Sequence, residues 1–260
     1  MITVALAAGY ATRLYPLTEN FPKPLLEVAG SSILDRLLAD FDSFPEVTRH
    51  VVISNHRYIG RFEEWLRGAN YAKPIELLDD GTTDNDHRLG AVCDIQFAIE
   101  RLSLDDDLLV YAGDNLLDFS LRGFADSFHR HNATSILCYH EPDEQALRKT
   151  GVLSLGEDFR VLEMLEKPKN PPSHWAVPPF YIYARRDLPQ VKRAIELGAH
   201  TDSPGGFIAY LAGVSPVYAW PMPGKRYDVG TLENYEQVCE LFAQRRGGLR
   251  SPARNGGRHP

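Results

Sequence analysis

The stretch from Leu6 to Gly30, LAAGYATRLYPLTENFPKPLLEVAG, decides the fold class of this 260-residue chain. It begins where a short apolar run, Ile2–Leu6, ends, and it passes at once into small residues, threonines and three prolines. A Gly/Ala-rich turn after a buried strand lets a ligand approach the backbone closely, and its exposed N–H groups can bind phosphate. Arg13 and Lys23 lie in this loop outside any helical stripe, so their charges are free to meet an anion. The alternative is a polar surface loop with solvated charges.

Apolar strands alternate with amphipathic helices through the first half of the chain. Repeated strand–helix units of this kind predict a parallel sheet covered on both faces, with ligands bound at the carboxyl ends of the strands. The expected strands are Ile2–Leu6, His50–Ser54, Ile75–Leu78 and Leu108–Gly113. The expected helices run from Ser31 or Ser32 as N-cap to Asp42, from Tyr58 to Arg67, and from Leu89 to Leu102.

The second half is richer in β-structure. The expected strands are Ala133–His140, Gly151–Leu155, Arg160–Pro168 and Trp175–Arg185, and the expected helices are Asp187–Leu197, Pro204–Ala212 and Leu232–Arg245. We predict one domain over residues 1–244, with a nucleotide-type half at 1–132 and a β-rich half at 133–244. The Gly/Pro/Arg-rich tail at 245–260 is predicted to be disordered.

Composition excludes several classes of function. A formal net charge of −7 without a basic stripe argues against a nucleic-acid partner. No apolar run approaches the roughly 20 residues of a membrane helix, so no membrane association is expected. Three widely spaced cysteines form no metal-binding pattern, and nothing resembles a signal peptide, which together predict a cytoplasmic protein with reduced thiols. Local cations still allow anionic ligands.

The opening stretch resembles the signature loop of the sugar-1-phosphate nucleotidylyltransferases, and three later segments resemble that family's motifs in the same order. These are YAGDN (Tyr111–Asn115), LEKP (Leu165–Pro168) and RYDVGTLENY (Arg226–Tyr235). The resemblance runs from Met1 to about Phe242. It implies an α/β fold of the Rossmann-like nucleotide-diphospho-sugar transferase type, with a mixed central sheet flanked by helices and a β-rich sugar-binding half.

The reaction that this resemblance implies joins a nucleoside triphosphate (NTP) to a sugar 1-phosphate and releases pyrophosphate. The attacking phosphate is already anionic near pH 7, because its second pKa is about 6. Catalysis should therefore rest on positioning and electrostatics. Arg13 and Lys23 are the implied catalytic cations, Arg13 at the departing phosphates and Lys23 at the α-phosphate. The implied nucleotide-binding residues are Leu6, Ala7, Ala8, Gly9, Gly90 and Asp114.

By the same resemblance, Asp114 and Asp228 would share Mg²⁺, the expected cofactor, since hard carboxylates suit this ion. Gly151, Glu166 and Lys167 would bind the sugar phosphate. Neighbours on an extended strand point to opposite faces, so Glu166 and Lys167 can share a site only where the strand ends or bends. Their alternative role is an exposed ion pair of under about 1 kcal/mol.

The sequence defines the nucleotide base and the phosphate acceptor less well than it defines the reaction. Gly90 could lie under the base, and Thr83, Asn85 or Arg88 could contact its edge, with analogy alone favouring a pyrimidine triphosphate. Ala8 and Ala11 stand where the family often has glycine, which alanine can replace where φ is negative. Pro178 and Pro179 remove two backbone donors near the expected sugar site, which admits an unusual acceptor such as a cyclitol phosphate.

Two other functions are compatible with the same motifs. One is a non-catalytic regulatory protein that binds nucleotide sugars, and the other is a nucleotidylyltransferase for a cyclitol or other non-sugar phosphate. The sequence identifies neither the base nor the sugar, and it leaves open the pathway, feedback control and whether the chain forms a homo-oligomer.

Overall fold

The computed structural model describes residues 1–248. Its strands are β1 (Ile2–Leu6), β2 (Glu27–Val28), β3 (Ser31–Ser32), β4 (Arg49–Ser54), β5 (Ile75–Asp79), β6 (Leu108–Ala112), β7 (Leu116–Leu117), β8 (Ser135–His140), β9 (Gly151–Leu155), β10 (Val161–Glu166), β11 (Trp175–Val177), β12 (Phe180–Tyr183), β13 (Tyr218–Pro221) and β14 (Arg226–Tyr227). Its α-helices are α1 (Ile33–Asp42), α2 (Ile59–Gly68), α3 (Ala91–Leu102), α4 (Arg122–His131), α5 (Glu144–Leu147), α6 (Pro189–Glu196), α7 (Gly205–Leu211) and α8 (Leu232–Gly248).

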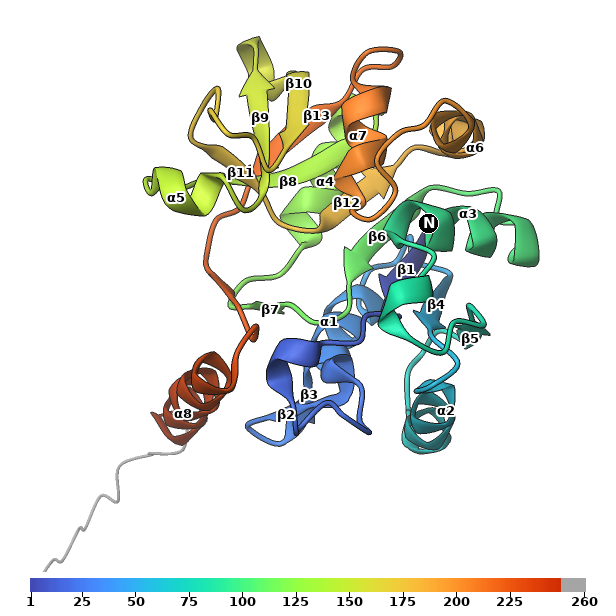
Figure 1. The fold of residues 1–260 in the computed structure, drawn as a ribbon, viewed down its shortest axis with the longest axis vertical. Coiled ribbons are helices and arrows are strands. Elements are labelled where there is room, and N and C mark those ends of the chain that lie inside the picture. Colours follow the sequence, from blue (N-terminus) through green and yellow to red (C-terminus); the bar gives the residue numbers. More distant parts are fainter. Residues whose placement is uncertain (249–260) are drawn as a thin grey trace, which may run out of the picture.

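Ten strands form one mixed sheet, in the order β10-β9-β11-β8-β12-β6-β1-β4-β5, with β13 added beside β8 (Figure 1). The four strands β6, β1, β4 and β5 are parallel to one another. β12 runs antiparallel to both β6 and β8 and so joins this parallel part to the β-rich part. The expected mixed α/β sheet is therefore confirmed.

Alternate residues of the central strands enter different cores, because successive side chains on a strand point to opposite faces. Val4 of β1 packs in the core that contains residues of α3, α6 and α7. Its neighbour Ala5 packs in the core that contains residues of α1, α2 and α4. Helices thus cover both faces of the parallel strands, which explains why these strands are apolar throughout.

The first helix begins where the sequence predicts. Ser32 is the N-cap of α1, and its hydroxyl oxygen accepts a hydrogen bond from the Asp35 backbone N–H at 3.0 Å. The Asp35 carboxylate in turn accepts hydrogen bonds from Ser32, from the indole of Trp65 and from the hydroxyl of Tyr71. These hydrogen bonds lower the pKa of Asp35 although burial alone would raise it.

Several boundaries differ from expectation. The single strand predicted over Trp175–Arg185 is divided into β11 and β12 by Pro178 and Pro179, because consecutive prolines cannot donate to a ladder. Three elements, α4, α5 and β13, were not predicted from the sequence. α8 continues through Gly248, so residues 245–248 of the predicted tail are helical, and the rest of that tail lies outside the described residues.

Among residues 1–248, no helix is both long enough and apolar enough to cross a membrane.

Removal of the Ser32 cap should destabilise the chain. In Ser32→Ala the Asp35 N–H loses its partner inside a region where Ser32 is only 5% exposed, so the free energy of unfolding should fall by about 1–2 kcal/mol in urea titrations. Ser43→Ala is a matched control at the other end of α1, where the exposed hydroxyl donates only to the Asp40 carbonyl, and it should cost less than about 0.5 kcal/mol. Equal losses in both variants would contradict the capping role.

Candidate active site

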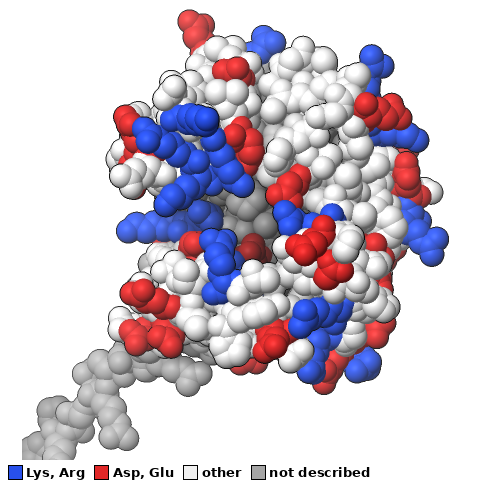
Figure 2. Space-filling view, viewed as in Figure 1, with Lys and Arg blue, Asp and Glu red and all other residues white. Residues whose placement is uncertain are grey.

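A cavity of about 360 Å³ opens at the carboxyl ends of the parallel strands. Leu6 of β1 and Ala112 of β6 line it, as does Asp80, which directly follows β5. From β1 the chain first builds β4 and β5 on one side and then β6 on the other, so the strand order reverses between β1 and β6. Ligands bind in open α/β sheets at such a reversal. The space-filling view shows a central hollow on this face, with lysine and arginine side chains gathered at its rim (Figure 2).

The loop after β1 forms one wall of the cavity. It contributes Ala7, Ala8, Gly9, Ala11 and Arg13. Its far side is anchored in a separate apolar cluster that includes Leu14, Val28 and Val229. Ala11 and Leu14 both line the cavity and contact this cluster, so the cluster holds the loop in place at the cavity wall.

The backbone at Ala11 differs from expectation. Ala11 has φ of 45°, in the left-handed region, whereas Ala8 is not among the positive-φ residues of the described chain. The Thr18 hydroxyl donates a hydrogen bond to the Ala11 carbonyl at 2.8 Å and holds this turn. The expectation that alanine replaces glycine only at negative φ is thus wrong at Ala11, where the surrounding loop imposes a conformation that costs alanine about 1 kcal/mol.

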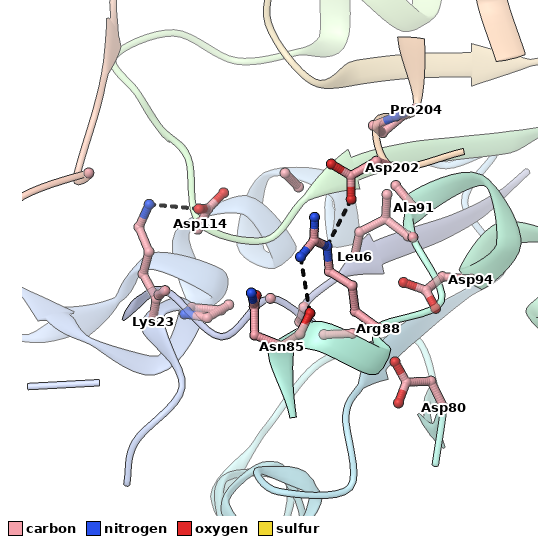
Figure 3. A pocket seen from close by; sticks show the side chains of 18 of the residues that line it. Leu6, Lys23, Asp80, Asn85, Arg88, Ala91, Asp94, Asp114, Asp202 and Pro204 are labelled. Carbon is pink, nitrogen blue, oxygen red and sulfur yellow. Dashed lines mark hydrogen bonds and ion pairs between the residues drawn. The ribbon is translucent and has the colours of Figure 1, made fainter. Parts of the chain in front are cut away.

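Lys23 and Asp114 form an ion pair across the cavity, with 2.6 Å between Lys23 Nζ and Asp114 Oδ2 (Figure 3). Lys23 is only 8% exposed, on a 3₁₀ turn (Lys23–Leu25) that follows Pro22. Asp114 follows β6, and its second oxygen accepts a hydrogen bond from the Asn115 amide at 3.0 Å. A nearly buried ammonium is tolerated because this carboxylate neutralises it. The pair is the charged centre of the site.

Arg13 also lines the cavity, and no hydrogen bond or ion pair of its side chain is found within residues 1–248. Its side chain is exposed. Arg13 is therefore a cation free to meet an anionic group that enters beside Lys23.

The opposite wall is made by the turn before α3 and by a segment of the β-rich half. Gly90 has φ of +91°, and a Cβ there would lie 2.8 Å from the carbonyl oxygen of Thr201. Val92 N donates to that same oxygen at 3.0 Å. Arg88 binds Asp202 at 2.8 Å and donates to the Asn85 carbonyl, so its charge is already engaged. Position 90 requires glycine for two reasons: its φ is positive, and a side chain there would clash with the Thr201 backbone of the β-rich half.

Two further carboxylates, Asp80 and Asp94, face each other on this side of the cavity (Figure 3). We call this pair the acidic recess. Asp94 is 6% exposed, and its Oδ1 has no hydrogen-bond partner among the described residues. Burial, reinforced by the charge of Asp80, raises the pKa of Asp94 to about 7. Burial also raises the pKa of Asp80, whose Oδ1 accepts hydrogen bonds from the Thr82 N–H and hydroxyl.

The residues expected at the sugar phosphate lie beside this cavity and do not line it. β10 ends at Glu166, and Lys167 follows with φ of 47°. The chain thus bends between the two residues. Glu166 Oε2 is buried without a partner among the described residues, and it lies against Gly151 and Gly205, where Cβ atoms would come within 3.1 and 2.8 Å. Pro204, the neighbour of Gly205, lines the cavity, so Glu166 is adjacent to it.

Strand pairing places Asp228 opposite Asn115, the neighbour of Asp114. β14 pairs antiparallel with β7, with Tyr227 opposite Leu116, and Asp228 is the residue that follows β14. Arg226 donates to the Asn115 side chain at 3.2 Å. A Cβ on Gly230, a cavity residue, would lie 2.7 Å from Asp228 Oδ2. Asp228 is exposed and is adjacent to the cavity wall without lining it.

The structure therefore gathers most of the expected site. Eight of the predicted positions line one cavity: Leu6, Ala7, Ala8, Gly9, Arg13, Lys23, Gly90 and Asp114. Gly151, Glu166, Lys167 and Asp228 do not line it. Of the three candidates for the base edge, Asn85 and Arg88 line the cavity and Thr83 does not.

Three acidic residues were missed by the sequence analysis. Asp80 directly follows β5, and Asp114 comes two residues after β6, so the same strand-end rule could have found Asp80. Asp94 carried a weaker signal, as an acid on the otherwise apolar face of α3. Asp202 lies in a loop, and no sequence pattern around it indicates a binding site. It reaches the cavity through its contact with Arg88, which is distant in sequence.

Comparison with protein families gives a match over almost the whole described chain, to the family described as nucleotidyl transferase, at residues 2–245. The chain is 29% identical to a bifunctional protein GlmU of Methanococcus aeolicus, over 67% of this chain but only 38% of that relative. It is 28% identical to the UTP–glucose-1-phosphate uridylyltransferase AglF of Haloferax volcanii, over 70% of this chain and 72% of AglF. It is also 28% identical to a mannose-1-phosphate guanylyltransferase of Mycobacterium tuberculosis, over 98% of this chain and 67% of the relative.

Among solved structures, the chain resembles a UDP-glucose pyrophosphorylase complexed with UDP-glucose. The TM-score is 0.76 at 18% identity, with 94% of this chain and 98% of the other covered. The shared feature at this level of identity is the fold.

The unusual backbone at Ala11 can be tested by a pair of glycine substitutions. Ala11→Gly relieves the left-handed strain, which offsets the greater entropy of glycine in the unfolded chain. Ala8→Gly adds that entropy and also removes a buried methyl group, since Ala8 is 9% exposed. The free energy of unfolding, measured by urea titration, should be about 1 kcal/mol higher in Ala11→Gly than in Ala8→Gly. The reverse order would contradict the positive φ at Ala11.

The raised pKa of Asp94 makes a prediction about stability. Between about pH 4 and 7 the folded chain holds a proton on Asp94 that the unfolded chain has lost, so stability falls as pH rises through this window. Asp94→Asn has no such proton to lose, so its stability should not fall in this window. The free energy of unfolding of Asp94→Asn minus that of the parent should increase by on the order of 2 kcal/mol from pH 5 to pH 8, since one pKa unit corresponds to about 1.4 kcal/mol.

The control for this pH series is Asp86→Asn, an exposed carboxylate in the same part of the chain that does not line the cavity. Its stability relative to the parent should stay nearly constant from pH 5 to pH 8. A flat profile for Asp94→Asn as well would show that Asp94 ionises without penalty in the folded chain.

Proposed function

The chain belongs to the nucleotidyl transferase family, and we propose that it transfers a nucleotidyl group from an NTP to a sugar 1-phosphate, releasing pyrophosphate and forming an NDP-sugar. The observation that carries this proposal is the convergence of Arg13, Lys23 and Asp114 with the small residues 7–9 at one strand-end cavity. AglF and the mannose-1-phosphate guanylyltransferase are named for activities of the same reaction class, which supports the proposal.

The proposed chemistry is an in-line displacement at the α-phosphorus. A phosphate oxygen of the sugar phosphate forms a bond to that phosphorus while the bond to the bridging oxygen breaks, and pyrophosphate carries away the electron pair. No general base is required, because the attacking oxygen is already ionised. The chain's task is to hold several anions together, which cations achieve best in a partly water-excluded site.

Each cation has a role that follows from its position. Lys23 is nearly buried and held by Asp114, so its ammonium is a fixed point charge for the α-phosphate. Arg13 is exposed at the cavity mouth, and its planar guanidinium suits bidentate contact with the departing pyrophosphate. The glycine and alanine backbone at residues 7–9 lets the triphosphate approach closely.

The acceptor would lie toward the β-rich half. Glu166 Oε2 is a buried acceptor without a partner among the described residues, and Gly151 and Gly205 pack closely against it. Sugar hydroxyls are the complementary donors. Lys167, displaced from Glu166 by its positive φ, would contact the sugar phosphate. A cyclitol phosphate offers the same hydroxyls and is the second acceptor class to test.

Asp114 and Asp228 fit a magnesium ion by the chemistry of their donors, since two hard carboxylates near a phosphate site suit this cation. In the described chain the Asp228 carboxylate has no hydrogen-bond partner, whereas Asp114 is held by Lys23 and Asn115. No group of three or more His, Cys, Asp or Glu side chains suited to a metal occurs among residues 1–248, so phosphate oxygens and water would complete the coordination. When bound, Mg²⁺ would neutralise charge on the phosphates.

The experiment is a matrix of NTPs against glucose 1-phosphate, mannose 1-phosphate and inositol 1-phosphate with Mg²⁺, with pyrophosphate as the readout. Turnover is expected with at least one pair and should stop when EDTA is added. Asp228→Asn should lower turnover about 100-fold or more with an unchanged melting temperature, because this exposed carboxylate supports no other side chain.

The matched control is Glu233→Gln, an exposed carboxylate at the start of α8, which should retain full turnover. Folded protein that binds an NDP-sugar but releases no pyrophosphate with any pair would favour the regulatory alternative. Full activity in Asp228→Asn would contradict the proposed metal position.

A further inference from the structure

The acidic recess has no role in the reaction just proposed. Asp80 and Asp94 line the same cavity as Lys23 and Asp114 but lie at its other end, with Asn85 and Arg88 between them (Figure 3). Phosphates are drawn to Lys23 and Arg13, and above about pH 7, where Asp94 has lost its proton, the two carboxylates of the recess repel them. A bound NTP therefore directs its triphosphate to the Lys23 end and leaves its base to face the recess.

The recess offers hydrogen-bond acceptors that the protein leaves unused. Asp94 Oδ1 and Asp80 Oδ2 are both buried without partners among the described residues. Asp80 is held in place because its other oxygen accepts from the Thr82 N–H and hydroxyl. Arg88 does not neutralise the pair, since its guanidinium binds Asp202 and the Asn85 carbonyl. A buried unpaired carboxylate oxygen is costly, so a ligand that donates hydrogen bonds there gains affinity.

The bases differ in how many donors they can supply. The base edge of uracil and of thymine has a single N–H donor, flanked by two carbonyl oxygens that a carboxylate repels. Adenine and cytosine each carry an exocyclic amino group with two N–H donors. Guanine has three donors, because its amino group stands beside a ring N–H, and one carboxylate can accept from both at once. Carboxylates accept hydrogen bonds from base amino groups in this way in nucleic-acid recognition.

We propose that Asp80 and Asp94 select the nucleotide by accepting hydrogen bonds from an exocyclic amino group, so that the chain takes amino-bearing NTPs, guanine above the others, in preference to UTP and dTTP. This inference rests on the proposed function for the placement of the triphosphate. It replaces the preference for a pyrimidine, which analogy alone supported. The raised pKa of Asp94 agrees with a desolvated carboxyl close to a second one.

The test measures equilibrium binding of GTP, ATP, CTP, UTP and dTTP to the full chain by calorimetry at pH 8, where Asp94 is ionised, without sugar phosphate. GTP should bind about tenfold or more tightly than UTP and dTTP, since hydrogen bonds to charged groups are the strong ones. Inosine triphosphate, which lacks only the 2-amino group of GTP, should lose most of that preference. Asp94→Asn should weaken GTP about tenfold while changing UTP less than about threefold.

Asp86→Asn serves as the control and should leave all five affinities unchanged, because that carboxylate is exposed and does not line the cavity. UTP or dTTP binding as tightly as every amino-bearing NTP would overturn the inference and leave the proposed function intact. Equal losses for GTP and UTP in Asp94→Asn would also overturn it. Failure of every NTP to bind would refute both proposals.

Discussion

The ion pair between Lys23 and Asp114 is the interaction on which the site depends. These residues are 91 positions apart, yet 2.6 Å separates the ammonium nitrogen and the carboxylate oxygen. Lys23 could not remain 8% exposed without a counter-charge, because an unpaired buried ammonium is strongly disfavoured. The pair joins the first loop to the end of β6 across the point where the strand order reverses. This ion pair therefore fixes the positions of both the Lys23 ammonium and the Asp114 carboxylate.

Glycines let the two halves of the chain meet around that pair. Gly90 permits the turn before α3 to touch the backbone of Thr201, and Gly151 and Gly205 leave room for Glu166. The contact between Gly90 and Thr201 brings a segment of the β-rich half to the edge of a cavity built mainly by the parallel half. The packing of Glu166 against Gly151 and Gly205 lies within the β-rich half and places that carboxylate beside the same cavity.

The sequence predicted features that rest on local physics. The cap at Ser32 and the alternation of apolar strands with amphipathic helices depend only on neighbours along the chain, and both were found as expected. Errors occurred where long-range packing prevailed. Ala11 adopts a left-handed backbone because the surrounding loop holds it there. The buried position of Asp94 could not be read from α3 alone, since an acid on a helix is usually exposed.

By itself the sequence determined the fold class and predicted the loop that forms one wall of the cavity. Strand periodicity, the small-residue loop and the order of the motifs are all encoded in short stretches of the chain. Only the tertiary structure decided which charges are free. Arg13 remains available, whereas Lys23 is paired and Arg88 is bound to Asp202. The physical reason is that the charge state and partners of a side chain depend on burial and on groups distant in sequence, and these become defined only when the sheet brings them together.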